Sequence, residues 1–190
     1  MKKTFISLAA AISFGLFPLA LSAQQSPMIS AVRAEVSQHA KNLLAGAQEM
    51  PAGKYNYAPT AHQMTFGRMV LHIAQSDNFL CSRISGSEAP STGQLTEHSP
   101  KSQLIAAMNA SFNYCDEALA KVNDSELSEQ VPFFGGRKVS KAAAMLSLAT
   151  DLADHYAQEA IYLRLNGHQP PTGVGPVMGR SMGNRRGPAK

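Results

Sequence analysis

The chain has 190 residues, which suits one domain rather than two, and its formal charge is +4 at pH 7. Two of the positive charges are Lys2 and Lys3, and four more basic residues with no acid among them lie near the C-terminus: Arg180, Arg185, Arg186 and Lys190. The central part is therefore close to neutral, and it lacks the basic face with stacking aromatic side chains that is typical of a nucleic-acid binder.

Residues 1–23 have the layout of a secretory signal peptide. Two lysines precede an apolar stretch over residues 5–21, and small residues follow it, which predicts cleavage after Ala23. The alternative is a retained membrane anchor, but the stretch is near or below the roughly 20 residues that a spanning helix needs, and it contains Pro18. We therefore expect an exported protein, periplasmic or secreted, that is not an integral membrane protein.

The first predicted helix covers residues 26–50. Ser26 is a suitable N-cap, Pro27 fits the first turn, and apolar residues recur at helical spacing after them: Ile29, Val32, Val36, Leu43 and Leu44. Prolines and a glycine then break the helical pattern. The loop that follows carries Tyr55 and Tyr57, which we expect to lie over one end of a helical bundle.

The second predicted helix covers residues 65–84, and the third begins near residue 100. The apolar residues of the second helix form more than one stripe, which indicates burial on several sides: Phe66, Met69, Val70, Ile73, Phe79, Leu80 and Ile84. Ser99 or Ser102 is the expected N-cap of the third helix. The core stripe of that helix consists of Leu104, Ile105, Met108, Phe112, Cys115 and Leu119.

The segment "VPFFGGRKVS" precedes the fourth helix. Pro132 and the two glycines after it predict a short hairpin or an extended crossover rather than a helix. The fourth helix is predicted over residues 140–166, with Ser140 as N-cap and Gly167 as its C-terminal stop.

These elements predict an all-α fold, a four-helix bundle over residues 26–167 with a long crossover between the third and fourth helices. Residues 168–190 are rich in Gly, Pro and Arg, and we predict that they form a disordered tail. Bundle cores commonly hold metal ions between facing helices, so polar residues on inner faces are the candidate ligands.

Cys81 and Cys115 are the two cysteines of the chain. In an oxidising compartment such a pair is often bridged, which predicts a disulfide between the second and third helices. The alternative is a pair of buried thiols, since free cysteine is among the most buried residue types. The absence of C-x-x-C spacing argues against a redox motif or a cysteine-rich zinc site.

Asp151 and His155 lie four residues apart on the fourth helix. They share a face with Ala144, Leu148, Gln158 and Tyr162, and this face points towards the core. His72 occupies a comparable stripe of the second helix with Thr65, Met69, Ser76 and Phe79. Two imidazoles and a carboxylate from facing helices would leave coordination positions open, as catalytic zinc and related sites require.

Two alternatives need no metal. A lone histidine on an apolar helix face, as His72 is, is more often a hydrogen-bonded core histidine than a ligand, and Asp151 with His155 is also consistent with an ion pair at helical spacing on a solvated face. However, a carboxylate without a partner beside Leu148 and Leu152 would cost several kcal/mol. The G-x-S-x-G pattern occurs only in the tail segment "GRSMGNRRG", which resembles a flexible basic segment rather than a nucleophile elbow, and no phosphate-binding loop precedes a helix, so no catalytic residue is assigned.

Two stretches resemble the DinB-like superfamily of metal-binding four-helix bundles. The first is "MPAGKYNYAPTAHQMTFGRMVLHIAQSDNFLCS" around His72, and the second is "LADHYAQEAIYLRLNGHQPP" around His155. Together the similarity covers residues from about 26 to 171. The resemblance implies a divalent cation, nickel or zinc in typical members, held by one histidine of the second helix and two of the fourth. His72 matches the first position and His155 the last.

Asp151 stands at the position where the family usually has a histidine. A carboxylate also ligates zinc, nickel or iron, so the site is expected to survive as His72, Asp151 and His155. The other outcome is a site that has lost its metal. Some relatives are thiol-dependent S-transferases, which the resemblance implies as one activity.

The expected function is therefore binding of one divalent metal ion, with metal-assisted hydrolysis as the reaction that suits an exported protein. The alternatives are thiol S-transfer, which uses cytosolic thiols, and a non-catalytic envelope bundle. The expected partner is an unidentified small molecule rather than nucleic acid. The sequence leaves the oligomeric state open, with a homodimer as one alternative.

Overall fold

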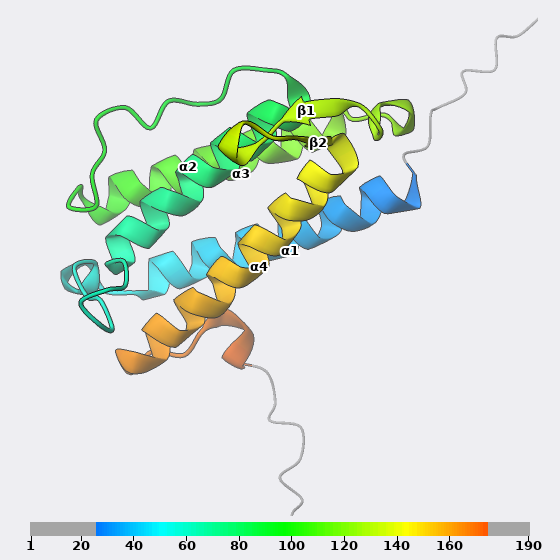
Figure 1. The fold of residues 1–190 in the computed structure, drawn as a ribbon. Coiled ribbons are helices and arrows are strands. Elements are labelled where there is room, and N and C mark those ends of the chain that lie inside the picture. The colour runs from blue at the N-terminus through cyan, green and yellow to red at the C-terminus, as the bar shows by residue number, and fades with distance from the viewer. Residues whose placement is uncertain (1–25, 175–190) are drawn as a thin grey trace, which may run out of the picture.

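The computed structural model describes residues 26–174, so the predicted signal peptide lies outside the described residues. Four α-helices form a bundle within this part of the chain (Figure 1): α1 Pro27–Glu49, α2 Phe66–Ser85, α3 Lys101–Ala120 and α4 Lys141–Leu165. Both α1 and α2 pack against α3 and α4. The predicted all-α fold with four helices is confirmed.

Local capping signals fix most helix ends. The Ser26 hydroxyl accepts a hydrogen bond from the Ile29 amide, and the Ser140 hydroxyl accepts one from the Ala143 amide. Gly167 adopts φ +80°, a conformation that glycine enters without a steric penalty, directly after α4. Each of these ends was predicted.

The start of α3 differs from the prediction. Pro100 stands at the N-cap and makes no side-chain capping bond, so neither Ser99 nor Ser102 caps this helix. The Ser99 hydroxyl instead accepts a hydrogen bond from the Thr96 amide, within the preceding turn. A serine near a helix start therefore serves a local turn as readily as a cap.

The connection between α1 and α2 closes one end of the bundle. Its 3-10 turn Ala52–Lys54 leads to Tyr55, whose hydroxyl donates to the Ala47 carbonyl over 2.7 Å. The Tyr55 ring meets Phe66 edge-on with centroids 5.1 Å apart, and Tyr57 meets Tyr162 in the same way at 6.2 Å. Both tyrosines thus lie over a bundle end, as expected.

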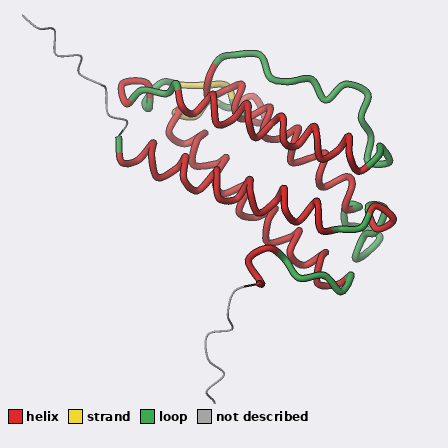
Figure 2. The backbone as a smooth tube through the Cα atoms, turned by 180° about the vertical axis from the view of Figure 1, so that it is seen from behind, coloured by secondary structure: helices red, strands yellow, loops and turns green. Residues whose placement is uncertain are grey.

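The helices run in two parallel pairs, and the long crossover joins α2 to α3. At one end, Glu97 just before α3 accepts a hydrogen bond from Thr65 just before α2. At the other end, the Tyr114 hydroxyl near the end of α3 donates to the Ser87 carbonyl just beyond α2. The segment 86–100 therefore returns along the whole bundle, as Figures 1 and 2 show.

The predicted crossover between the third and fourth helices is therefore wrong. α4 begins at the end of the bundle where α3 stops, and Lys141 in its first turn pairs with Glu126 over 2.6 Å. A 20-residue helix is about 30 Å long, and the 15 residues of 86–100 can span that length in extended form. Both connections are long enough to cross, so their lengths did not identify the crossover.

Residues 121–140 are instead folded locally. A 3-10 turn, Asp124–Glu126, precedes a hairpin of β1 Gln130–Pro132 and β2 Lys138–Ser140, in which Val131 pairs with Val139. The loop contains the turn Phe134–Gly136, and its Phe134 ring stacks on Phe79 of α2 with centroids 4.4 Å apart. The hairpin was one of the two predicted forms of this segment.

A disulfide joins Cys81 of α2 to Cys115 of α3, with their Cα atoms 5.3 Å apart. Both sulfur-bearing residues are fully buried. The two cysteines lie at similar depths in parallel helices, so the bridge fixes the register of α2 against α3. The predicted pairing is confirmed.

The first residues of the predicted tail differ from the expected disorder. Pro171–Val174 form a 3-10 turn, His168 pairs with Glu49 over 3.0 Å, and Thr172 bonds to the Tyr156 hydroxyl. Residues 175–190 lie outside the described part of the chain. Among residues 26–174, no helix is both long and apolar enough to cross a bilayer.

Candidate functional site

Two well-capped helices carry the candidate residues. The Thr65 hydroxyl accepts a hydrogen bond from the Arg68 amide at the start of α2, two turns before His72. On α4, Asp151 and His155 follow one another at a spacing of four residues, which places them on one face. Because α2 packs against α4, these side chains can meet inside the bundle.

The three predicted side chains do lie together. The rings of His72 and His155 meet edge-on with centroids 5.0 Å apart, and His155 Nε2 lies 3.6 Å from Asp151 Oδ2. His155 is only 6 % exposed, whereas the Asp151 side chain is 34 % exposed. The group therefore extends from the core towards the solvent.

Hydrogen bonding differs among these residues. The Ser76 hydroxyl donates to Asp151 Oδ2 over 2.8 Å, so the carboxylate has a partner across the helix interface. Both ring nitrogens of His155 are buried and have no hydrogen-bond partner among the described residues. Such a group costs about 1–3 kcal/mol, which makes this imidazole the position that most needs an additional partner.

The environment of His72 favours the neutral form of its imidazole. Burial lowers the pKa of His72, and the neighbouring His155 and Arg68 lower it further, while Asp151 acts in the opposite direction. A neutral imidazole retains the lone pair that a metal ion requires. The environment of His72 thus suits a ligand without requiring one.

The family model described as the DinB superfamily matches residues 30–158, which include all three residues. The chain belongs to the DinB superfamily. No curated protein matches it in sequence.

Several solved structures share this fold at low sequence identity. A DinB-like protein from Bacillus cereus ATCC 10987 is 16 % identical with a TM-score of 0.65, and the match covers 75 % of this chain and 95 % of that one. One from Bacillus subtilis is 20 % identical with a TM-score of 0.60, covering 73 % and 93 %. A conserved protein from Enterococcus faecalis is 14 % identical with a TM-score of 0.62, covering 75 % and 98 %.

In this DinB-superfamily member, the donor atoms of His72, Asp151 and His155 are of types that bind metal ions, but the side chains are not arranged as a metal-binding cluster. Within residues 26–174, no group of three or more His, Cys, Asp or Glu side chains is arranged as a metal-binding cluster. Nevertheless, His155 brings two unpartnered nitrogens, and Asp151 brings a carboxylate that is already oriented by Ser76. Two imidazoles and a carboxylate are a donor set that zinc, nickel and iron accept.

Glu159, which the sequence reasoning missed, extends the same face of α4. It is fully buried, and neither carboxyl oxygen has a hydrogen-bond partner within the described residues. Burial raises its pKa well above the ordinary value. The residue expected on the inner stripe was Gln158, but that side chain is exposed and donates to Asp154. Continuing the four-residue spacing of Asp151 and His155 would have identified Glu159.

Asp77 of α2 is a second buried carboxyl that the sequence reasoning missed. It is fully buried, and neither of its carboxyl oxygens has a hydrogen-bond partner among residues 26–174. Burial raises its pKa well above the ordinary value, and the negative charge of Asp151 raises it further. Asp77 lies four residues before Cys81 and therefore on the same face of α2. Because Cys81 was expected in the core, this spacing could have predicted that Asp77 is buried.

Proposed function

We propose that this member of the DinB superfamily is an exported protein that binds one divalent metal ion through His72, Asp151 and His155. The observation that carries the proposal is His155, a buried imidazole whose two nitrogens lack partners among the described residues, with His72 and Asp151 beside it. Binding a cation would offset the cost of that burial. It would also use the charge of Asp151, which faces the imidazole across 3.6 Å.

Each residue has a distinct part in this site. His72 and His155 supply nitrogen donors from facing helices, and Asp151 supplies a carboxylate at the more exposed side. Ser76 orients the Asp151 carboxylate by its hydrogen bond, the role that outer-shell donors have in metal sites. A zinc, nickel or iron ion with an open position lowers the pKa of water, which is the chemistry of metal-assisted hydrolysis.

The compartment favours hydrolysis over thiol transfer. The Cys81–Cys115 disulfide is typical of oxidising compartments, in agreement with the predicted signal peptide over residues 1–23. Low-molecular-weight thiols are cytosolic co-substrates, whereas water is present everywhere. An exported S-transferase would lack its thiol supply.

A second candidate function is a non-catalytic bundle without a metal. Two observations favour it: Ser76 already satisfies one Asp151 oxygen, and the described side chains form no preformed metal cluster. In that case Asp151 and His155 act as a polar pair at helical spacing. Such a pair contributes only a few tenths of a kcal/mol.

Metal analysis of the purified mature protein separates the two functions. We expect close to one metal ion per chain and a rise in the melting temperature on adding zinc or nickel, since a ligand at 100 times its Kd adds about 2.7 kcal/mol. His72→Ala and His155→Ala should lose the metal, whereas the exposed His62→Ala is the matched control.

Asp151→Asn gives the sharper comparison. Under the metal proposal it should weaken metal binding by about tenfold or more, because the negative ligand is lost. Under the second function, no metal binds and the substitution changes the melting temperature only slightly. Metal-free protein with an unchanged melting temperature in zinc and nickel would overturn the metal proposal.

A further inference from the structure

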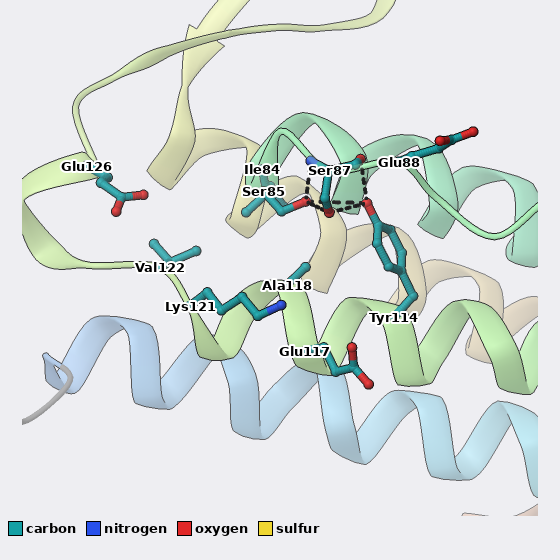
Figure 3. A pocket seen from close by; sticks show the side chains of 10 residues that line it. All are labelled: Ile84, Ser85, Ser87, Glu88, Tyr114, Glu117, Ala118, Lys121, Val122 and Glu126. Carbon is teal, nitrogen blue, oxygen red and sulfur yellow. Dashed lines mark hydrogen bonds between the residues drawn. The ribbon is translucent and has the colours of Figure 1, made fainter.

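A cavity of about 420 Å³ lies between the C-terminal ends of α2 and α3. Figure 3 shows its walls: a hydroxyl cluster formed by Ser85, Ser87 and Tyr114 on one side, and Lys121, directly after the last residue of α3, on the other. Ile84 and Val122 contribute an apolar surface. His72 is twelve residues before Ile84, or about 18 Å along the helix, so this cavity is separate from the candidate metal site.

The hydroxyl cluster has more acceptors than donors. The Ser85 hydroxyl donates its proton to the Cys81 carbonyl, and the Tyr114 hydroxyl donates its proton to the Ser87 carbonyl. The three oxygens lie 2.7 to 3.3 Å from one another, and of the three hydroxyls only Ser87 has a proton left for them, while the Ser87 amide also donates to the Ser85 oxygen over 3.1 Å. Each hydroxyl oxygen has two lone pairs, so the cluster favours a ligand group that donates hydrogen bonds.

The helix ends favour a positively charged donor at this position. α2 and α3 are parallel and end beside the cavity, where their dipoles contribute partial negative charge. Glu88 and Glu117 at the rim add to that potential, although their carboxylates point away from the hydroxyl cluster in Figure 3. An ammonium group carries the positive charge that this negative potential attracts, and its three N–H groups can donate hydrogen bonds to the hydroxyl oxygens.

Lys121 favours a carboxylate at the other side. Its side chain lines the cavity, and within the described residues it has no acidic side chain at ion-pair distance. The neighbouring carboxylate of Glu126, in contrast, is already held by Lys141 over 2.6 Å and by Asn123 over 2.9 Å. A ligand carboxylate therefore has a lysine that no acidic side chain holds at ion-pair distance, although Glu117, four residues before it, also lines the cavity.

We propose that this cavity binds a free α-amino acid, with its ammonium group at the Ser85–Ser87–Tyr114 cluster and its carboxylate at Lys121. The side chain of the amino acid would pack on Ile84 and Val122. This binding site requires neither a metal nor a reaction at His72, so it is independent of the proposed function.

The test is a calorimetric titration of the mature protein with each of the twenty free L-amino acids at up to about 10 mM, a range that detects millimolar Kd values. We expect saturable binding of one or a few of them. The tightest ligand is then compared with its 2-hydroxy acid and its carboxamide. Both should bind at least about tenfold more weakly, because each lacks one charged group. No binding by any amino acid would overturn the proposal, and equal binding of the 2-hydroxy acid would overturn the ammonium assignment.

Variants locate the binding site. Lys121→Met should weaken binding by about tenfold or more, and Ser87→Ala by a smaller factor. Both positions are exposed and are expected to tolerate substitution, which the far-ultraviolet circular dichroism spectrum checks. Lys54→Met, an exposed lysine outside the cavity, is the matched control. Binding that survives Lys121→Met unchanged would place the ligand elsewhere and overturn the assignment.

Discussion

The buried carboxyl of Glu159 predicts an unusual pH dependence of stability. Its carboxyl group lies against Gly46 of α1, where a Cβ atom would come within 2.7 Å of Glu159 Cδ. Burial raises the Glu159 pKa well above the ordinary value of 4.5. Below about pH 4.5 both the folded and the unfolded chain carry this proton. Above it the unfolded chain releases the proton first, so the free energy of unfolding falls as pH rises.

The magnitude follows from the linkage relation. Each carboxyl that stays protonated in the folded state but ionises in the unfolded chain lowers the free energy of unfolding by about 1.4 kcal/mol per pH unit. The loss continues until pH passes the folded pKa. Glu159→Gln removes one ionisable group and keeps the shape of the side chain. We expect the substitution to remove the contribution of this one carboxyl group from the pH dependence of the free energy of unfolding. Compared with the wild type, the variant should therefore be relatively more stable at neutral pH than at about pH 4.5.

The assay is urea unfolding of the wild type and Glu159→Gln at pH values between about 4.5 and 8. The slopes are compared rather than the absolute free energies, because the amide that replaces the carboxyl group also lacks a hydrogen-bond partner at this position. The exposed Glu117→Gln is the control for loss of a surface charge. Parallel curves for wild type and Glu159→Gln would refute a neutral, buried Glu159. Asp77→Asn should flatten the remaining slope in the same way, since burial also raises the Asp77 pKa.

Two further predictions concern stability. The disulfide closes a loop with a sequence separation of 34 residues, so the Cys81→Ala/Cys115→Ala variant should lose about 3–4 kcal/mol of unfolding free energy in urea. Unreduced mature protein should show no alkylatable thiol, and two reactive thiols would contradict the bridge. Gly67→Ala should cost about 1–3 kcal/mol, because its Cβ would lie 2.5 Å from the Glu97 backbone oxygen, which cannot turn aside. Gly53→Ala, whose Cβ meets open space, is the control for that experiment, and an equal melting temperature of the two variants would contradict the reasoning.

Most features that depend on neighbouring residues were predicted correctly from the sequence, with the N-cap of α3 as the exception. Ser26 and Ser140 cap their helices, and Gly167 ends α4, because capping depends on residues within one turn. The pairing of Cys81 with Cys115 was also accessible, because the chain offers only two cysteines. The likeness of the segments around His72 and His155 to the DinB superfamily was correct as well.

The identity of the crossover could not be derived in the same way. Segments 86–100 and 121–140 are both long and both contain glycine and proline. What distinguishes them is a set of contacts between residues far apart in the chain. Asn78 donates to the Pro90 carbonyl over 2.8 Å, and Lys101 donates to the Met50 carbonyl over 2.7 Å. These contacts fix 86–100 along the bundle and place the start of α3 at the end of α1.

The sequence by itself determined the helices, the N-caps of α1 and α4, the disulfide partners and the helix faces that carry His72, Asp151 and His155, because each depends on local spacing or on residue type. Only the tertiary structure decided how the helices are connected in space, that Ser76 holds Asp151, and that both carboxyl oxygens of Glu159 are buried without a partner among the described residues. It also brought the ends of α2 and α3 together around the cavity at Lys121. Burial and long-range contacts arise when helices pack, and a single helix's residue spacing does not contain them.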